Sequence, residues 1–385
     1  FGPGPIRFSW FSVVLPSLVL NYFGQAAHIL GHPAAVENPF YALVPAWALY
    51  PMVILATTAT VVASQALISG AFSLTQQAVQ LGYFPRITIV HTSKEAEGQI
   101  YVPEINTLLL VSCVGLVFSF KSSNALAAAY GIAVTGTMAI TTLTYYVVVT
   151  RTWKWPVWRA APLAAAFLLV DLAFFSATST KLVEGGWFPL LLASSVFTVM
   201  TTWHTGRRYL AQAMADAAFP LDLFLQDLKT QRPLRVKGTA VFMASNANGV
   251  PPVLLHHFKH SQALHERVLL LTVQGLHVPE AHADDRTNVE ELGEGFYRVT
   301  LRYGFMETPD IPRALQGLDR FGLTISADRT SYFLGRETLL PTGTAHMWPW
   351  RKRLFAFISR NSLPATAYFG LPPGRVVELG MQIRL

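Results

Sequence analysis

The chain has 385 residues, of which 52% are hydrophobic and only 13% are charged. Because soluble domains usually carry about 25% charged residues, this composition excludes a wholly soluble protein and indicates membrane-spanning segments. The net charge of +7 does not indicate a nucleic-acid-binding protein, since much of the excess lies beside hydrophobic segments, where basic residues orient a chain in the membrane. The single cysteine, Cys113, excludes an intrachain disulfide framework and a cysteine-based zinc site.

The charged residues are distributed unevenly along the chain. Residues 1–208 hold ten Lys or Arg and six Asp or Glu, whereas residues 209–385 hold nineteen and sixteen. We therefore predict a transmembrane domain over residues 1–208 and a C-terminal α/β domain over residues 209–385.

Six apolar segments are long enough to cross a bilayer, which requires about 20 apolar residues. They cover about residues 10–30, 43–72, 105–120, 126–150, 160–177 and 187–203. Tryptophan residues stand near several of their ends, as expected where aromatic rings lie at the lipid headgroups. The second segment continues into an amphipathic stretch, 73–81, which Gly82 and Pro85 should end.

The basic residues between these segments predict an orientation. Eight of them flank alternate ends, and only Lys121 and Lys181 lie in the opposite loops. The eight are Arg7, Arg86, Lys94, Arg151, Lys154, Arg159, Arg207 and Arg208. The positive-inside rule therefore places the loop 82–104 and everything after Arg208 in the cytoplasm, and the loop 34–44 outside.

The C-terminal part alternates strand-like and helical runs, which favours a small α/β domain. Strands are predicted at 236–243, 268–273, 296–303 and 331–334, and helices at 310–321 and 351–360. Residues 219–232 are interpreted as a linker or a docking helix. We predict no metal site here, and we interpret four histidines as a solvated surface cluster: His256, His257, His260 and His265.

Polar residues inside the second segment are candidates for an ion pathway. Thr57, Thr60 and Ser64 share one helical face, and Gln65 and Ser69 share a neighbouring one. Hydroxyl and amide oxygens suit a dehydrated monovalent cation, which is bound by several weak oxygen dipoles. Helix packing is the alternative, because Ser and Thr often bridge neighbouring helices.

The fourth segment offers a further polar face. Tyr130, Thr137 and Thr141 lie on one side of it, where a tyrosine hydroxyl beside a cavity could close a gate. A packed aromatic ring with a hydrogen bond is the alternative interpretation.

Asp171 is the acidic residue well inside an apolar segment, in the sequence "AFLLVDLAFFS". An acid in the apolar interior costs about 2.5–3.5 kcal/mol on insertion scales, and such residues usually serve function. Because no Lys or Arg lies well inside any segment, the sequence supplies no basic partner. Asp171 is therefore a candidate proton carrier, with a structural hydrogen bond as the alternative.

Five longer motifs follow one another along the chain. They are "LVLNYFGQAAHIL" (18–30), "ATVVASQALISGAFSLTQQAVQLGYFPR" (59–86), "GQIYVPEIN" (98–106), "AAAYGIAVTGTM" (127–138) and "VEGGWFPL" (183–190). These motifs resemble those of the Kup potassium-permease family, called HAK or KT in fungi and plants. The closing "VVELGMQIRL" adds a weaker likeness in the C-terminal part. The motifs are long and occur in one order across the membrane part, so chance agreement is excluded.

The resemblance implies a polytopic helical membrane protein of the LeuT-like, inverted-repeat class, in which this chain supplies helices seven to twelve and the C-terminal domain. It also implies potassium uptake across the inner membrane, coupled to protons by alternating access, with the potassium site mainly on the helices before Phe1 and Asp171 as a transport acid. K⁺ and H⁺ are then the transported ions, and the protein is embedded in the lipid bilayer. No cofactor, enzymatic activity or nucleic-acid partner is expected.

Alternatives to potassium transport stay open at the level of the sequence. The same fold could carry another substrate, such as an amino acid. The C-terminal domain could instead be a membrane-anchored, nucleotide-binding regulator, although it holds neither a P-loop nor a dinucleotide fingerprint. A homodimer and a nucleotide at the C-terminal domain are further expectations.

Overall fold

The computed structural model describes residues 2–32, 38–92, 100–216, 219–244, 249–343 and 345–384. The chain divides into two compact units, Phe1–Gly70 and Ala71–Leu385, and each is described by itself. Lys94 and residues 34–37 of the loop 34–44, on which the predicted orientation partly depends, lie outside the described residues.

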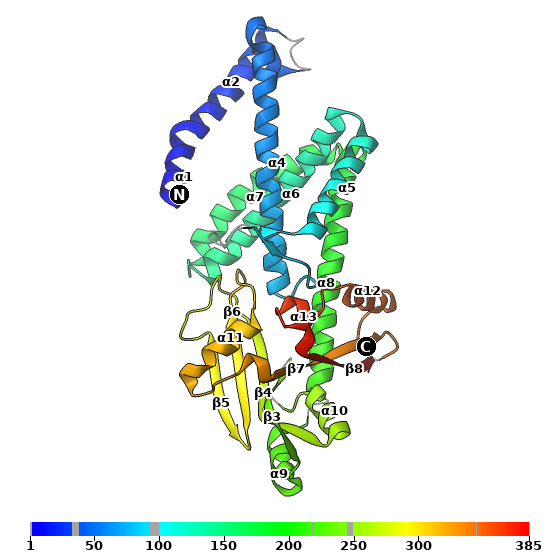
Figure 1. Cartoon of the computed structure of the whole chain (residues 1–385). Coiled ribbons are helices and arrows are strands. Elements are labelled where there is room, and N and C mark those ends of the chain that lie inside the picture. Colours follow the sequence, from blue (N-terminus) through cyan, green and yellow to red (C-terminus); the bar gives the residue numbers. More distant parts are fainter. Residues whose placement is uncertain are drawn as a thin grey trace. The chain divides into compact units, whose positions relative to one another are not determined.

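Within those ranges, six helical stretches are long and apolar enough to cross a membrane (Figure 1). They are Pro3–Gly31, Ala46–Gln80, Pro103–Phe120, Ser123–Arg151, Val157–Ser179 and Leu182–Asp216. Their order is that of the six predicted segments. The second continues to Gln80, in agreement with the predicted amphipathic stretch 73–81, and the sixth continues beyond its predicted end to Asp216. The described part is thus a polytopic helical membrane domain followed by a C-terminal domain that contains a sheet.

The described residues of the first unit form helices joined by short turns, without a strand. Its elements are α1 (Pro3–Ser9), a π-helical turn (Trp10–Val14), α2 (Leu15–Gly31), α3 (Pro39–Ala42), a 3₁₀ turn (Ala46–Ala48) and the larger part of α4 (Leu49–Gln80). On α2 the Gln25 amide donates to Asn21 Oδ1 at 3.2 Å, one turn away. This bond therefore closes within one helix.

The second unit begins with the last turns of α4 and contains four further long helices. After the short strands β1 (Val90–His91) and β2 (Ile100–Tyr101), these are α5 (Pro103–Phe120), α6 (Ser123–Arg151), α7 (Val157–Ser179) and α8 (Trp187–Asp216). α6 and α7 pack along each other through small residues, with Ala128 and Ala164 buried. A π-helical turn, Leu182–Gly186, joins α7 to α8 and rests on α6.

Two glycines of the "VEGGWFPL" motif explain how that turn can rest so closely on α6. A Cβ on Gly185 would lie 2.4 Å from the backbone oxygen of Ala125, and a Cβ on Gly186 would lie 1.9 Å from Cδ1 of Ile132. Both glycines are buried, so no side chain fits at either position. The motif therefore fixes a close backbone contact at the start of α8.

The C-terminal domain is built on one six-stranded sheet within the described residues. The strand order is β5-β6-β4-β3-β7-β8, and every neighbouring pair is parallel except the edge pair β5 and β6. The strands are β3 (Leu234–Ala244), β4 (Ala263–Gly275), β5 (Thr287–Gly293), β6 (Phe296–Tyr303), β7 (Thr330–Leu340) and β8 (Val376–Arg384). The chain passes from β3 outward to one edge and then returns to β7 on the other side of β3, so the strand order reverses between β3 and β7.

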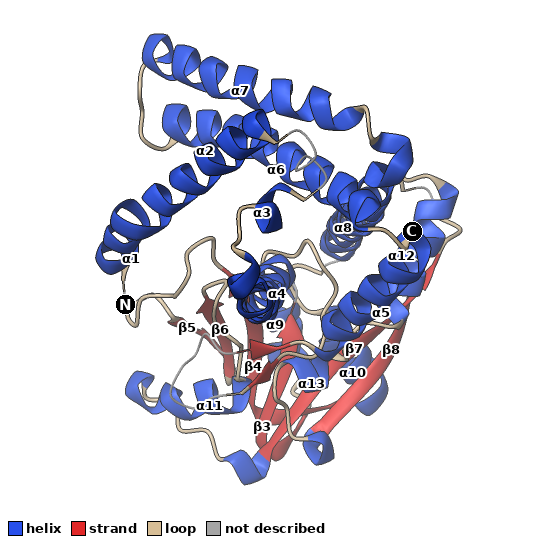
Figure 2. Cartoon of the chain, turned by 90° about the horizontal axis from the view of Figure 1, so that it is seen from above, coloured by secondary structure: helices blue, strands red, loops and turns tan. Residues whose placement is uncertain are grey.

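Helices cover both faces of this sheet (Figure 2). On one face α9 (Leu221–Gln231) and α10 (Pro252–Ser261) pack through Phe224 and Leu254 against Phe242 and Phe296. On the other, α11 (Ile311–Gln316) packs through Leu315 against strand residues such as Leu269. Shorter elements complete the domain: 3₁₀ turns at Gly317–Phe321, Ala327–Arg329 and Pro373–Arg375, and the helices α12 (Pro349–Arg360) and α13 (Ala365–Tyr368). The result is a three-layer α/β domain, as two buried faces of a parallel sheet require.

The four predicted strands correspond to β3, β4, β6 and β7. β6 has the predicted bounds, the other three are longer than predicted, and β5 and β8 were missed. Residues 219–232 contain α9, which contributes Leu221, Phe224 and Leu228 to the domain core and is therefore no linker.

The predicted solvated histidine cluster is wrong for two of its four members. The ring of His257 lies 4.6 Å from that of Phe333, and the ring of His265 lies 5.9 Å from it. Burial lowers the pKa of both histidines, and His265 lowers that of His257 further. His256 and His260 are exposed, as predicted. No group of three or more potential metal ligands occurs among the described residues.

Candidate functional site

The polar residues predicted for the second segment all lie on α4 within the first unit. Thr57, Thr60, Ser64, Gln65 and Ser69 are exposed in this chain. The hydroxyl of Thr57 donates to the Val53 carbonyl, and that of Thr60 to the Ala56 carbonyl, both at 2.8 Å. Since each hydroxyl proton is directed into its own helix, the lone pairs of the oxygen point outward and could contact a cation.

The predicted face of the fourth segment lies on α6 in the second unit. Tyr130 is 71% exposed, and Thr137 and Thr141 are exposed beside it on the same face. The Thr137 hydroxyl donates to the Ala133 carbonyl and the Thr141 hydroxyl to the Thr137 carbonyl, both at 2.8 Å. These residues form a polar stripe, but the structure does not bring Asp171 to it.

Asp171 is buried on α7, with 5% of its surface exposed, and it has a partner that the sequence analysis missed. Thr142 on α6 donates its hydroxyl to Asp171 Oδ2 at 2.6 Å. A hydroxyl-to-carboxylate bond of this length is typical of a charge-assisted hydrogen bond. The carboxyl group is thus held between two membrane helices by a neutral donor.

A second polar pair repeats the first along the same two helices. The hydroxyls of Thr135 on α6 and Thr178 on α7 lie 3.1 Å apart. Thr135 precedes Thr142 by seven residues, and Thr178 follows Asp171 by seven. On two antiparallel helices, equal spacings of seven residues bring both pairs, Thr135–Thr178 and Thr142–Asp171, opposite each other. The sequence therefore contained a signal for the Asp171–Thr142 pair.

At the other end of the second unit, the last turns of α4 bond to the C-terminal domain. The side-chain amide of Gln76 donates to the Met306 carbonyl at 3.4 Å, and that of Gln80 donates to the Glu307 carbonyl at 2.8 Å. Both acceptors lie in the loop between β6 and α11. The amphipathic end of α4 is thus attached to a loop of the sheet domain more than 200 residues later.

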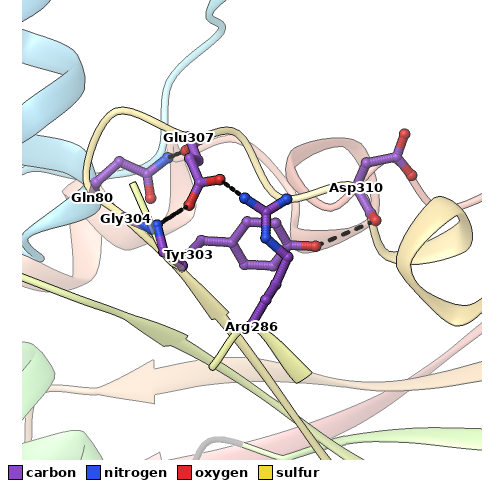
Figure 3. A network of polar contacts seen from close by, with 7 residues as sticks. Gln80, Arg286, Tyr303, Gly304, Glu307 and Asp310 are labelled. Carbon is purple, nitrogen blue, oxygen red and sulfur yellow. Dashed lines mark hydrogen bonds and ion pairs between the residues drawn. The ribbon is translucent and has the colours of Figure 1, made fainter. Parts of the chain in front are cut away.

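Glu307 organises that loop (Figure 3). Its carboxylate accepts from the backbone N–H of Gly304 at 2.6 Å and from that of Ala281 at 3.0 Å, and it forms an ion pair with Arg286. Nearby, the hydroxyl of Tyr303 donates to the Asp310 carbonyl at 3.4 Å, and burial raises the pKa of Tyr303. One half-buried carboxylate thus holds the backbone of the loop that Gln80 contacts.

Arg86, just after α4, makes a second attachment. Its guanidinium lies 5.9 Å from the centre of the Tyr368 ring, and its carbonyl accepts from the Leu363 N–H at 2.8 Å. Burial and the neighbouring Arg207 lower the pKa of Arg86, while burial raises that of Tyr368 to about 12. The Tyr368 hydroxyl donates to Gln80 Oε1 at 3.0 Å, so both attachments meet at one residue.

A cavity of about 730 Å³ opens where α8 meets the carboxyl ends of β3 and β7. This is the point at which the strand order reverses, the usual ligand position in open α/β sheets. Among the described residues that line it, four arginines outnumber two glutamates: Arg86, Arg207, Arg336, Arg360, Glu337 and Glu378. Trp203 of α8 also lines the cavity, so it is shared by a membrane helix and the C-terminal domain.

Membrane-length helices, a buried acid between two of them and an attached α/β domain define a polytopic membrane protein with a C-terminal α/β domain. Two family models match the chain: the K⁺ potassium transporter integral membrane domain over residues 1–208 and the K⁺ potassium transporter C-terminal domain over residues 237–385. The chain belongs to this potassium transporter family, and the predicted resemblance to the Kup proteins is confirmed. The family is one of transporters rather than of enzymes.

Curated relatives match over the whole chain. It is 58% identical to the probable potassium transport system protein Kup of Anaeromyxobacter sp. (strain Fw109-5), covering 59% of that protein. It is 56% identical to the probable potassium transport system protein Kup 1 of Syntrophobacter fumaroxidans, covering 58% of that protein. It is 54% identical to the probable potassium transport system protein Kup of Myxococcus xanthus, covering 59% of that protein. The chain thus spans about three fifths of the length of these relatives. No solved structure matches it.

Proposed function

We propose that the chain is part of a potassium uptake system of the cytoplasmic membrane. Support comes from the family models for both domains and from relatives named as potassium transport proteins. Oxygen-rich faces on α4 and α6 suit a dehydrated K⁺. An amino acid as substrate has less support, because the matched relatives are named for potassium.

Coupling to protons by alternating access is the finer part of the proposal, and the observation that carries it is the Asp171–Thr142 pair. A carboxyl group can exchange a proton, and this one is buried between two membrane helices with a hydroxyl donor as its partner. Because Thr142 is neutral, it leaves Asp171 able to change charge when a proton or a cation arrives. The LeuT-like arrangement of the helices is proposed on the resemblance alone.

The test is Asp171→Asn in the full-length protein. Asn keeps the shape and can still accept from Thr142, but it cannot ionise. We expect normal abundance in the membrane, strongly reduced K⁺ uptake and loss of the pH dependence of uptake. Thr142→Val is the companion variant, because it removes the hydrogen bond and keeps the carboxyl group, so it should shift the pH dependence without abolishing uptake. Wild-type uptake by Asp171→Asn at every pH, or uptake that falls only in step with abundance, would make Asp171 a structural residue.

The orientation of the chain is a separate proposal: Arg86 and everything after Arg208 lie in the cytoplasm. The contacts of Gln80 and Arg86 with the C-terminal domain support part of it, because they put the end of α4 and the end of α8 on the same side of the membrane. Lys121→Cys and Lys154→Cys, both at exposed positions, form a matched pair in a Cys113→Ala background. An impermeant thiol reagent on intact cells should label position 121 and spare position 154, and the reverse pattern would invert the orientation.

A regulatory ligand at the C-terminal domain is a second proposed function, favoured by the cavity at the strand reversal. Its excess of arginine suits an anionic ligand, and a nucleotide is the ligand to test first. Since Arg86, Trp203 and Arg207 line the cavity, calorimetry with adenine nucleotides needs the whole protein rather than residues 209–385 alone. If no adenine nucleotide in the panel gave a heat of binding, this proposal would be wrong.

A homodimer is also proposed, and the mass of the purified protein in lipid discs would test it.

A further inference from the structure

The helix α12 divides its residues between two faces. Phe355 is fully buried and Lys352 is 7% exposed, whereas Trp350 and Phe357 are 52% and 64% exposed. Arg353 lies between these two aromatic residues on the same face, and Arg360 continues it one turn further. Because positions 350, 353, 357 and 360 are separated by three or four residues, they form one stripe along the helix. We call it the aromatic–basic stripe.

The buried face fixes α12 to α8. A Cβ on Gly206 would lie 2.4 Å from the Phe355 ring, so the absence of a side chain there is what admits the ring. The Arg351 Nε donates to Thr202 Oγ1 at 2.9 Å, and the Trp203 and Phe355 rings lie 5.5 Å apart. The stripe is therefore held on the side of α12 that faces away from α8.

The position of this contact along α8 sets the depth of α12 in the membrane. Trp187 and Trp203 are sixteen residues apart, or about 24 Å along a helix. The hydrocarbon core is about 30 Å thick, so if Trp187 lies at one boundary, Trp203 and Gly206 lie at the other. Figure 2, which looks down α8, shows α12 lengthwise, and Figure 1 shows it crossing beside α8. On that placement of Trp187, α12 extends along the plane in which lipid headgroups meet the hydrocarbon.

We propose that the aromatic–basic stripe of α12 binds the membrane surface at which α8 ends, with its arginines on the headgroups of anionic lipids. Tryptophan and phenylalanine are the residues that enter this boundary, and arginine reaches outward to phosphate. The stripe carries Arg353 and Arg360, and α12 contains no acidic residue, so the charge of the stripe is complementary to an acidic lipid surface. α9 is the contrasting helix of the same domain, because its exposed Leu223 stands next to Asp222.

The test is the environment of spin labels on the full-length protein in lipid nanodiscs. Phe357→Cys carries the label on the stripe and Leu223→Cys carries it on α9, both in a Cys113→Ala background. Collisions with oxygen report lipid, and collisions with a water-soluble nickel complex report water. In discs that contain phosphatidylglycerol, we expect a ratio of oxygen to nickel collisions at position 357 that is several times that at position 223.

The charge on the stripe provides the second arm. Adding Arg353→Glu, or replacing phosphatidylglycerol by phosphatidylcholine, should lower the ratio at position 357 and leave position 223 unchanged. Arg353 is exposed and does not line the cavity, so this change should not disturb folding. Nickel-accessible labels at 357 in every lipid would overturn the proposal, since α12 would then face water. Labels shielded from both reagents would also overturn it, because another protein surface, such as a second copy, would cover the stripe. Equal ratios in neutral and anionic discs would overturn the recognition of acidic headgroups.

Discussion

The membrane helices and the C-terminal domain of the second unit differ in how much of their apolar surface is buried within the chain. The sheet domain buries Phe242, Phe296 and Leu269 completely, in cores on both faces of the sheet. In the apolar stretches of α6 and α7, only 17% of residues are buried within the chain, and none are in that of α5. The C-terminal domain thus carries its own core, whereas the membrane helices leave most of their apolar surface to lipid or to other helices.

Polar side chains follow the same division. In the described membrane helices, most threonine hydroxyls donate to a carbonyl of their own helix, as Thr137 and Thr144 do. Side-chain hydrogen bonds from these helices to distant segments are concentrated in two places. One is between α6 and α7, and the other is where α4 and α8 meet the sheet domain. These are the places where single substitutions should have effects beyond their own helix.

The largest effect is expected at Gly185, where the membrane helices come as close together as a packed core. In Gly185→Ala the new Cβ would lie 2.4 Å from the Ala125 backbone oxygen, which cannot rotate away. We expect a loss of about 3 kcal/mol or more. The measurement is the abundance and the thermal stability of the full-length protein in membranes. Gly115→Ala on α5 is the matched control, since nothing lies within 4 Å of its Cβ. Equal stability of the two variants would show that the turn before α8 moves readily.

The next largest effect is expected at Glu307, which joins the sheet domain to the end of α4. Glu307→Gln removes the charge that faces Arg286 and puts an amide where two backbone N–H groups need an acceptor. Hydrogen bonds to charged groups contribute about 1.5–3 kcal/mol, so we expect a loss of about 2–3 kcal/mol. Glu280→Gln, in the same region but exposed, should leave the melting temperature of the full-length protein unchanged. A similar melting temperature for both variants would mean that the loop is held by other contacts.

The C-terminal domain should fold without the membrane helices, but α12 should loosen. A chain of residues 220–385 keeps both cores of the sheet and loses the contact of Phe355 with Trp203 and Gly206. A chain of residues 200–385 keeps that contact. Burial of a phenylalanine contributes about 2 kcal/mol, so the longer chain should melt several degrees higher, by circular dichroism. A random-coil spectrum for both chains would contradict the independence of the domain.

The sequence predicted the elements that consist of long hydrophobic runs. It did not predict exposed edge strands or contacts between residues far apart in the chain. The six apolar segments and the four central strands each form a continuous run, which lipid or two covered faces of a sheet demand. β5 and β8 were missed because they are the edge strands, and their residues alternate between exposed and half-buried. Glu290 and Glu291 of β5 also look like loop residues when no neighbouring strand is known.

The candidate site was predictable in its residue types but not in its pairing. Asp171 stood out because an acid is rare in an apolar helix, whereas Thr142 is one of many threonines on α6, and only the antiparallel register distinguishes it. The bonds of Gln76 and Gln80 could not be predicted, because their acceptors are backbone carbonyls of a loop. Such contacts have no sequence pattern, since every residue has a carbonyl group.

The smallest effect concerns pH and the two half-buried histidines of the sheet domain. Burial lowers the folded-state pKa of His257 and of His265 below 6.5, their ordinary value. Well above pH 6.5 both are neutral in the folded and the unfolded chain, so their contribution to stability is fully present there. Below it the unfolded chain takes up protons first, so stability should fall until the pH passes the folded-state pKa values. The buried Nδ1 of His265 has no hydrogen-bond partner among the described residues. A proton added there would have no acceptor, which also disfavours the charged form in the folded chain. His257→Gln with His265→Gln should therefore flatten the change in melting temperature between pH 7.5 and pH 5.5. His256→Gln with His260→Gln, exposed on α10, should keep the wild-type slope. If both double variants kept that slope, the acid sensitivity of the domain would have to come from its carboxylates. Protonation of His257 and His265 would then not destabilise their packing on Phe333.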